Sequence, residues 1–133
     1  MRRRLLLSIP VVLGLAACQG AGTADLAQEP ARNVFFTADS ASLDQAAQAV
    51  VANAAGLAKE HPNATVRVLG FAAPDSGSAQ FNRTLALARA QAVRDALVEA
   101  GIPRQRIRVE SRGAVPFEMF PTESRRVEIL VGR

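Results

Sequence analysis

The sequence has 133 residues, a formal net charge of +4, one cysteine and one histidine. A lone cysteine excludes an intrachain disulfide and a cysteine-based metal site. Three of the positive charges are Arg2, Arg3 and Arg4 at the amino terminus, and the chain has no Trp or Tyr on which bases could stack, so its basic balance does not indicate a nucleic-acid partner.

The first 17 residues have the pattern of an export signal. Arg2–Arg4 precede an apolar run, Leu5–Leu15, that is too short to span a bilayer as a helix. The next residues, Leu15-Ala16-Ala17-Cys18, resemble the lipobox of bacterial lipoproteins, in which a cysteine thiol receives the lipid. The alternative is an ordinary secretory signal followed by an incidental cysteine. We expect a signal peptide over residues 1–17 and lipidation at Cys18.

Residues 18–32 are mostly Ala, Gly, Gln and Thr without apolar periodicity, which predicts a flexible tether. The remaining residues, 33–133, are enough for one domain with a modest core. Within it, the β-branched and aromatic run Asn33–Thr37 predicts a first strand. A turn follows, and Ser42 with Gln45 fits a capping box.

The first predicted helix carries apolar residues at helical spacing and ends before Pro62: Leu43, Ala47, Val50, Ala54 and Leu57. His61 lies at its end, where a surface residue or a helix-terminal cation explains it better than a ligand role. The run Val66–Phe71 then predicts a central strand, followed by a polar loop over Ala72–Ser78.

Ser78 is the predicted N-cap of a long second helix that stops at Gly101. Its apolar stripe is predicted to be Phe81, Leu85, Ala88, Ala92, Ala96 and Ala100. Arg89 shares an edge with Leu85 and Val93, where a guanidinium needs an acidic partner or a route to water. A snorkelling side chain or an intramolecular ion pair would satisfy it; so would a ligand carboxylate bound by the guanidinium fork.

The last third predicts two strands, Arg106–Ser111 and Arg125–Val131, the second with Val127, Ile129 and Val131 on one face. Four arginines around the first of these strands are predicted to form its solvated face: Arg104, Arg106, Arg108 and Arg112. The loop over residues 112–123 is expected to fold a small apolar patch back onto the domain. Together the elements predict an α/β (α+β) sandwich, β-α-β-α-β-β, with two helices packed on one face of a mixed four-stranded sheet.

Two stretches resemble the OmpA C-terminal (peptidoglycan-binding) domain family, shared with the peptidoglycan-associated lipoproteins. LGF, a polar loop and FNRTLALARAQAVRDALVEAGIP match the family's central motif, and SRRVEILV resembles its N-R-R-V-E-I strand. The positions that match the central motif are Phe81, Asn82, Leu85, Arg89, Ala90 and Val93. The likeness spans residues 33–131 and agrees with the predicted element order.

The resemblance implies a clamp for the diaminopimelate end of a peptidoglycan stem, with an arginine for the carboxylate and an aspartate for the amine. Arg89 takes the arginine position. The aspartate position holds Ala73, and Asp75 lies two residues further on in a longer loop. Asp39 matches an Asp whose loop borders the family's cleft, with turn or cap chemistry as the alternative.

Two further family positions complete the candidate site. Asn82 either donates to the ligand or caps its own loop. Arg126 either reaches a ligand or pairs with Glu128 or Glu123. Ser124 stands where the family has Asn.

The sequence therefore predicts a non-enzymatic outer-membrane lipoprotein whose periplasmic domain binds peptidoglycan non-covalently and tethers the membrane to the wall. No cofactor, metal, catalytic residue or nucleic acid is expected, whereas other envelope proteins are possible partners. The alternative is a lipid-anchored protein–protein adaptor of the same fold that has lost the diaminopimelate clamp.

Overall fold

The computed structural model describes residues 25–133, and these contain four strands and two α-helices in the predicted order. The strands are β1 (Arg32–Phe35), β2 (Val66–Ala72), β3 (Ile107–Ala114) and β4 (Arg126–Val131). The helices are α1 (Gln45–Glu60) and α2 (Ala79–Glu99). The expected signal peptide and Cys18 lie outside the described residues.

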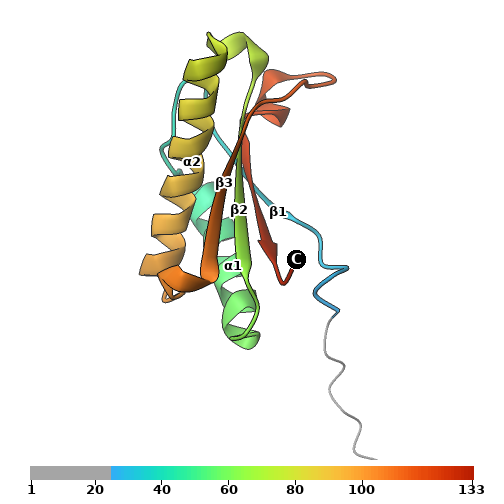
Figure 1. Ribbon diagram of the computed structural model, residues 1–133, viewed down its shortest axis with the longest axis vertical. Coiled ribbons are helices and arrows are strands. Elements are labelled where there is room, and N and C mark those ends of the chain that lie inside the picture. Colours follow the sequence, from blue (N-terminus) through green and yellow to red (C-terminus); the bar gives the residue numbers. More distant parts are fainter. Residues whose placement is uncertain (1–24) are drawn as a thin grey trace, which may run out of the picture.

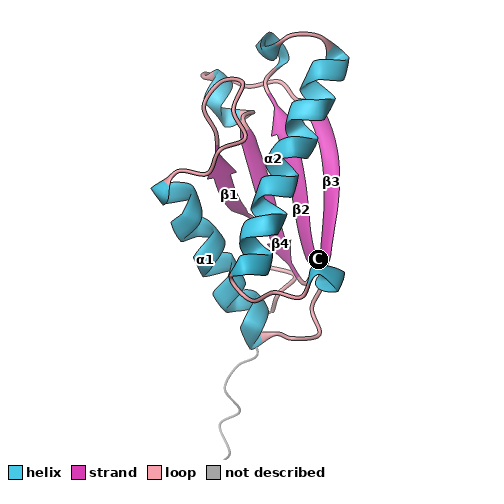
Figure 2. Ribbon diagram, turned by 90° about the vertical axis from the view of Figure 1, so that its left-hand side faces the viewer, coloured by secondary structure: helices cyan, strands magenta, loops and turns pink. Residues whose placement is uncertain are grey.

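The strands form one mixed sheet in the order β1-β4-β2-β3, and both helices cover the same face of it (Figures 1 and 2). β2 and β3 are parallel, as their connection through α2 requires, whereas β4 runs antiparallel to both β1 and β2. This confirms the predicted fold class. In β4, Val127, Ile129 and Val131 are buried and alternate with half-buried polar or apolar neighbours, which confirms the predicted face.

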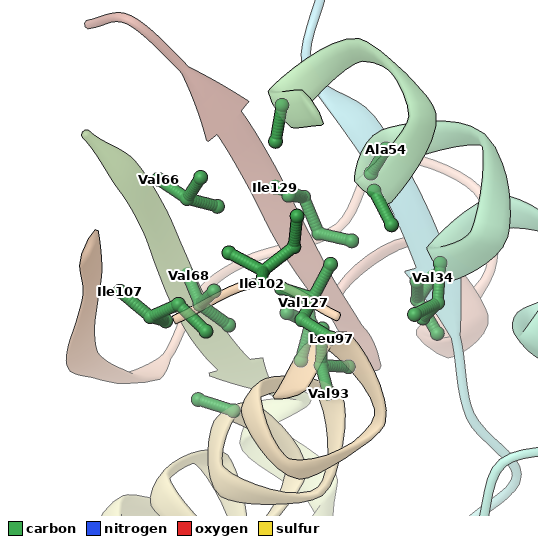
Figure 3. Close-up of a cluster of buried hydrophobic side chains, with 14 of the residues drawn as sticks. Val34, Ala54, Val66, Val68, Val93, Leu97, Ile102, Ile107, Val127 and Ile129 are labelled. Carbon is green, nitrogen blue, oxygen red and sulfur yellow. The ribbon is translucent and has the colours of Figure 1, made fainter. Parts of the chain in front are cut away.

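The core lies between the helices and the covered face of the sheet (Figure 3). Val93 and Leu97 of α2 and Ala54 of α1 face branched side chains from all four strands: Val34, Val66, Val68, Ile107, Val127 and Ile129. Burial of these apolar side chains is the main source of stability. Leu26 also packs against this core, and β1 begins at Arg32, so ordered structure starts before the expected boundary at residue 33.

The predicted cap of α2 is confirmed, but that of α1 is wrong. The Ser78 hydroxyl accepts from the Phe81 backbone N–H at 3.1 Å. In α1 the N-cap is Asp44, whose carboxylate accepts from the Ala47 N–H at 2.7 Å. The backbone N–H of Ser42 donates to the Ser40 hydroxyl oxygen instead, which leaves Ser42 in the preceding turn.

The buried stripe of α2 also differs from the prediction. It consists of Asn82, Leu85, Ala86, Arg89, Ala90, Val93 and Leu97, whereas Phe81 is 43% exposed. The cause lies in β2, where Gly70 has no side chain: a Cβ there would overlap the backbone carbonyl of Ala86 and lie 3.0 Å from the Ala90 Cβ. The backbone of α2 therefore rests directly on the strand, and this contact sets which face of the helix is buried.

Two expectations for the last third of the chain are also wrong. Arg106 is not a solvated strand residue: its guanidinium donates to the carbonyl oxygens that follow α1, with Ala58 at 2.8 Å and His61 at 2.7 Å. In the β3–β4 loop, Met119 and Phe120 are 73% and 62% exposed, so the apolar patch does not fold back. Their backbone N–H groups bond to the Glu123 carboxylate, which holds the loop away from the core.

Candidate ligand-binding site

All but one of the predicted site residues lie at one end of the sheet, where β1 and β2 end and β4 begins; the exception is Arg126. The β2–α2 and β3–β4 connections gather there, at the top of Figure 1, opposite the carboxyl terminus. We call this region the loop end and define it by Thr37–Ser40, Ala72–Ser78 and Phe120–Arg125. Arg89 reaches it from the third turn of α2.

The Arg89 side chain is fully buried and bonded to the chain's own backbone. Its Nε donates to the carbonyl oxygen of Ser40 at 2.8 Å. Its Nη1 and Nη2 donate to the carbonyl oxygens of Phe71 at 3.1 Å and Thr37 at 3.0 Å. The guanidinium thus ties the exits of β1 and β2 to α2, with the Phe36 ring 5.3 Å from its centre.

The electrostatic setting of Arg89 is unfavourable for its charge. Burial, and secondly the positive charge of Arg125, lower its pKa to about 10, and Asp39 opposes this shift. Among residues 25–133, no carboxylate forms an ion pair with Arg89. The guanidinium therefore neither snorkels to solvent nor pairs with an acid: its partners are backbone carbonyl groups.

Asp75 pairs with Arg125 rather than with Arg89. Ala73, at the family's aspartate position, is fully buried, and Asp75 lies in the exposed 3₁₀ turn η1 (Pro74–Ser76). Its carboxylate bonds to the Arg125 Nη2 at 3.2 Å. Asp39 is exposed and left-handed, with φ +54°, in the loop whose carbonyls hold Arg89.

Asn82 fastens the β2–α2 loop. It is only 2% exposed, and its Nδ2 donates to the Gly77 carbonyl oxygen at 3.4 Å, while its buried Oδ1 has no partner among the described residues. This agrees with the loop-capping alternative. The orphaned acceptor marks an incompletely satisfied polar position in the wall of the loop end.

Arg126 lies on the uncovered face of the sheet rather than at the loop end. It bonds to the Glu128 carboxylate at 2.8 Å and to the Glu123 carbonyl oxygen at 2.7 Å, and its guanidinium stacks 4.4 Å from the Phe71 ring centre. Arg125, its neighbour, is the cation that joins Asp75 and acts on Arg89. The two adjacent arginines of SRRVE indicate that one of them belongs to the site. Strand alternation alone does not say which of the two points to the loop end.

Within residues 25–133, no three His, Cys, Asp or Glu side chains are grouped so that they could hold a metal ion. In the same range no helix combines the length and apolar character needed to cross a membrane.

The loop end can present two cations, Arg89 and Arg125, with two acids, Asp39 and Asp75. Paired charges of both signs suit a zwitterionic group better than a simple anion, because each ligand charge then meets an opposite one. Direct contact between a ligand and Arg89 requires the Thr37–Ser40 loop to move, since that loop closes over the guanidinium.

The curated proteins similar to this chain include two lipoproteins. A peptidoglycan-associated lipoprotein of Rhizobium meliloti is 33% identical over 101 residues, which cover 76% of this chain and 57% of the relative. A probable lipoprotein of Escherichia coli, YiaD, is 34% identical over 103 residues, covering 73% and 47%. The chain thus spans about half the length of these curated relatives.

Solved structures share the fold. The crystal structure of the peptidoglycan-associated lipoprotein from Burkholderia pseudomallei superposes with a TM-score of 0.69 at 27% identity, covering 75% of this chain and 89% of that one. The OmpA-like domain of FopA1 from Francisella tularensis gives a TM-score of 0.67 at 23% identity, over 73% and 68%. The model of the OmpA family matches residues 35–126, which include both helices and most of the sheet. The chain belongs to the OmpA family.

Proposed function

We propose that this domain binds peptidoglycan non-covalently through its loop end. Two observations support this: the relatives named peptidoglycan-associated lipoprotein, and the cluster of Arg89, Arg125, Asp39 and Asp75 at one end of the sheet. The diaminopimelate end of a stem peptide carries an ammonium and a carboxylate on one carbon. Such a group matches a site with both signs of charge.

The first contact of the ligand carboxylate is with Arg125 in this proposal. Among residues 25–133, the one ion pair of Arg125 is with Asp75, and that carboxylate is about half exposed, so the pair can open at modest cost. The ligand ammonium then replaces Arg125 as the partner of Asp75. Arg89 attracts the ligand carboxylate through its positive charge while it is still covered by the Thr37–Ser40 loop. Once that loop has moved, Arg89 bonds to the carboxylate directly.

We further propose that the protein is an outer-membrane lipoprotein anchored through an acylated Cys18, with Gln19 next to it compatible with outer-membrane sorting. A triacylated cysteine holds a membrane firmly, since each buried methylene adds about 0.8 kcal/mol. The chain enters the fold at the end opposite the site: the Leu26 side chain packs beside Gly132, next to β4's carboxyl end. A membrane on that side leaves the loop end facing away, toward the wall, as a tether requires.

The second candidate function is a lipid-anchored protein–protein adaptor that has lost the clamp. It is favoured by Ala73 in place of the family aspartate and by the closure of Arg89 by backbone carbonyls. Losing one member of a desolvated charge pair costs about 2–5 kcal/mol, enough to remove useful affinity. The two candidates differ in whether the domain binds the wall at all.

Co-sedimentation with purified peptidoglycan sacculi distinguishes them. We expect the chain from residue 25 to 133, which contains the core cluster, to sediment with diaminopimelate-containing sacculi. Arg125→Gln should reduce binding about tenfold or more, because it removes the cation that the ligand carboxylate contacts first in this proposal. Arg104→Gln is the matched control: it removes the same charge from the opposite end of the sheet and should bind like wild type.

Melting of each variant, followed by circular dichroism, shows whether the fold is intact. Equal sedimentation of wild type, Arg125→Gln and Arg104→Gln would contradict recognition at the loop end. No sedimentation of any of them would leave the adaptor as the function.

A further inference from the structure

The outer edge of β1 has backbone groups that no strand pairs. β1 is an edge strand, bonded to β4 on one side only. The Phe36 N–H donates to the Arg125 carbonyl oxygen, so the backbone groups of alternate residues, including Val34, also face β4. Those of Asn33 and Phe35 then face outward, and no described residue bonds to them. Two N–H and two C=O groups are therefore available to an added strand.

A groove follows this free edge. Its lower part, about 100 Å³, lies between β1 and the first turns of α1 and is lined by Val34 and Val50 among others. Its upper part, about 350 Å³, reaches Thr122 and Arg125 of the β3–β4 connection. Phe35 and Asp44 line both parts, which makes the groove continuous along β1. In Figure 2 the edge of the sheet beside α1 is β1.

The two faces of the groove differ in chemistry. Phe35 lies on the uncovered face of the sheet, between the buried Val34 and Phe36, and is 48% exposed. Asp44 lies on the helix side as the N-cap of α1; one of its oxygens accepts from Ala47, and its carboxylate forms no ion pair within residues 25–133. An added strand points alternate side chains to these two faces. It would meet an aromatic ring on one and a free carboxylate on the other.

We propose that β1 is a docking edge for a short extended peptide of another protein, bound by strand addition. The peptide places an aromatic or aliphatic side chain against Phe35 and an adjacent lysine or arginine against Asp44. A foreign peptide fits better than a second copy, because β1 offers two outward residues, whereas a stable dimer buries about 800 Å² per partner. The upper part of the groove meets the loop end at Thr122 and Arg125. The proposal nevertheless does not depend on peptidoglycan binding, since the pairing residues Asn33 and Phe35 and the charged Asp44 are not part of the loop end.

The probe is the blocked pentapeptide Ac-Thr-Trp-Lys-Val-Thr-NH₂. The protein has no Trp, so the emission of the peptide reports its own burial without background. The full chain is solubilised in detergent, and a titration with micelles alone is subtracted. We expect the chain to shift the Trp emission with a Kd below about 1 mM. That range suits a few hydrogen bonds and one aromatic pair.

Three changes test the geometry. Asn33→Pro removes an outward N–H while keeping the bonds to β4, and should weaken binding about fivefold or more relative to Asn33→Thr, which keeps that N–H. A peptide methylated at the backbone nitrogen of its Trp tests the same strand pairing without altering the protein. Asp44→Asn keeps the helix cap and removes the charge, and should weaken the Lys peptide but not its Gln analogue, whereas Asp95→Asn on α2 should change neither.

Equal binding of the Asn33→Pro and Asn33→Thr variants, or of the methylated and unmethylated peptides, would overturn the proposal. So would the absence of any emission shift up to several millimolar peptide. A dimer of the full chain that Asn33→Pro dissociates would assign the edge to a second copy instead. Wall sedimentation of Asp44→Asn at the wild-type level would show that the two surfaces are separate.

Discussion

Arg89 joins three separate segments of the chain through one side chain. Truncating it to alanine removes the guanidinium N–H that each of the Thr37, Ser40 and Phe71 carbonyl groups accepts, and it opens a cavity. Thr37 keeps only a long bond from the Ser40 N–H, at 3.4 Å. An unsatisfied buried acceptor costs about 1–3 kcal/mol, so we expect Arg89→Ala to lower the free energy of unfolding by about 3–5 kcal/mol in urea titrations.

Arg94→Ala on the same helix is the control for Arg89→Ala, because Arg94 pairs only with the exposed Asp95. Its cost should stay below about 1 kcal/mol. Comparable costs for the two substitutions would show that the backbone bonds of Arg89 do not hold the loop end together. A large cost also means that lost wall binding by an Arg89 variant cannot by itself identify a ligand contact.

Glu123 organises the β3–β4 loop through its charge. Backbone N–H groups, first that of Glu118 and then that of Phe120, hold the pKa of the Glu123 carboxyl below its ordinary value of 4.5. A carboxyl with a lowered folded-state pKa stabilises the fold above its ordinary value, and this contribution is lost as the pH falls through the folded-state value. We therefore expect the amides of Met119 and Phe120 to lose protection below about pH 4.5, that is, to exchange faster relative to the intrinsic rate of an unprotected amide at the same pH.

The Glu123→Gln variant should show this faster exchange at neutral pH, with no further change on acidification. Glu118→Gln, which keeps the acceptor carboxylate, should behave like wild type. Unchanged exchange at Met119 and Phe120 in Glu123→Gln would contradict this account of the loop.

At the level of elements, the contact between α2 and β2 depends on one glycine. A methyl group at Gly70 would overlap the Ala86 carbonyl, so Gly70→Ala must push α2 from the sheet and should cost about 2 kcal/mol or more. Gly56 of α1 is the matched control, because a Cβ there meets nothing within 4 Å. Gly56→Ala should raise stability by about 0.5–1 kcal/mol. Thermal or urea unfolding of both variants should show stability changes of opposite sign. Equal changes would contradict the close contact between Gly70 and α2.

The elements themselves were predictable where a local pattern is repeated. Alternation in β4 gave the right buried face, and the serine cap and terminal glycine gave the right extent of α2. The buried face of α2 was not predictable from its own sequence, because Gly70 in another element selects it and because it contains Arg89 and Asn82. Likewise, nothing near Arg106 in the sequence shows that it bonds to the end of α1.

Across the whole molecule, the site and the chain entry lie at opposite ends of the sheet (Figure 1). Fold order and the identity of the loop-end segments followed from the sequence. The pairing inside the site did not: Asp75 with Arg125, and Arg89 with carbonyls, depend on how three loops meet. Resemblance located the candidate residues, but the longer β2–α2 loop decides which charges face each other.

The central claim is that the loop end recognises the zwitterionic terminus of a wall stem peptide. It is tested most directly by adding a soluble diaminopimelate-containing muropeptide to the isotope-labelled protein and following backbone amide shifts. We predict that shifts concentrate in Thr37–Ser40, Ala72–Ser78 and Phe120–Arg125 and saturate with added ligand. Shifts absent from these segments, or centred on the opposite end near His61 and Gly132, would contradict it.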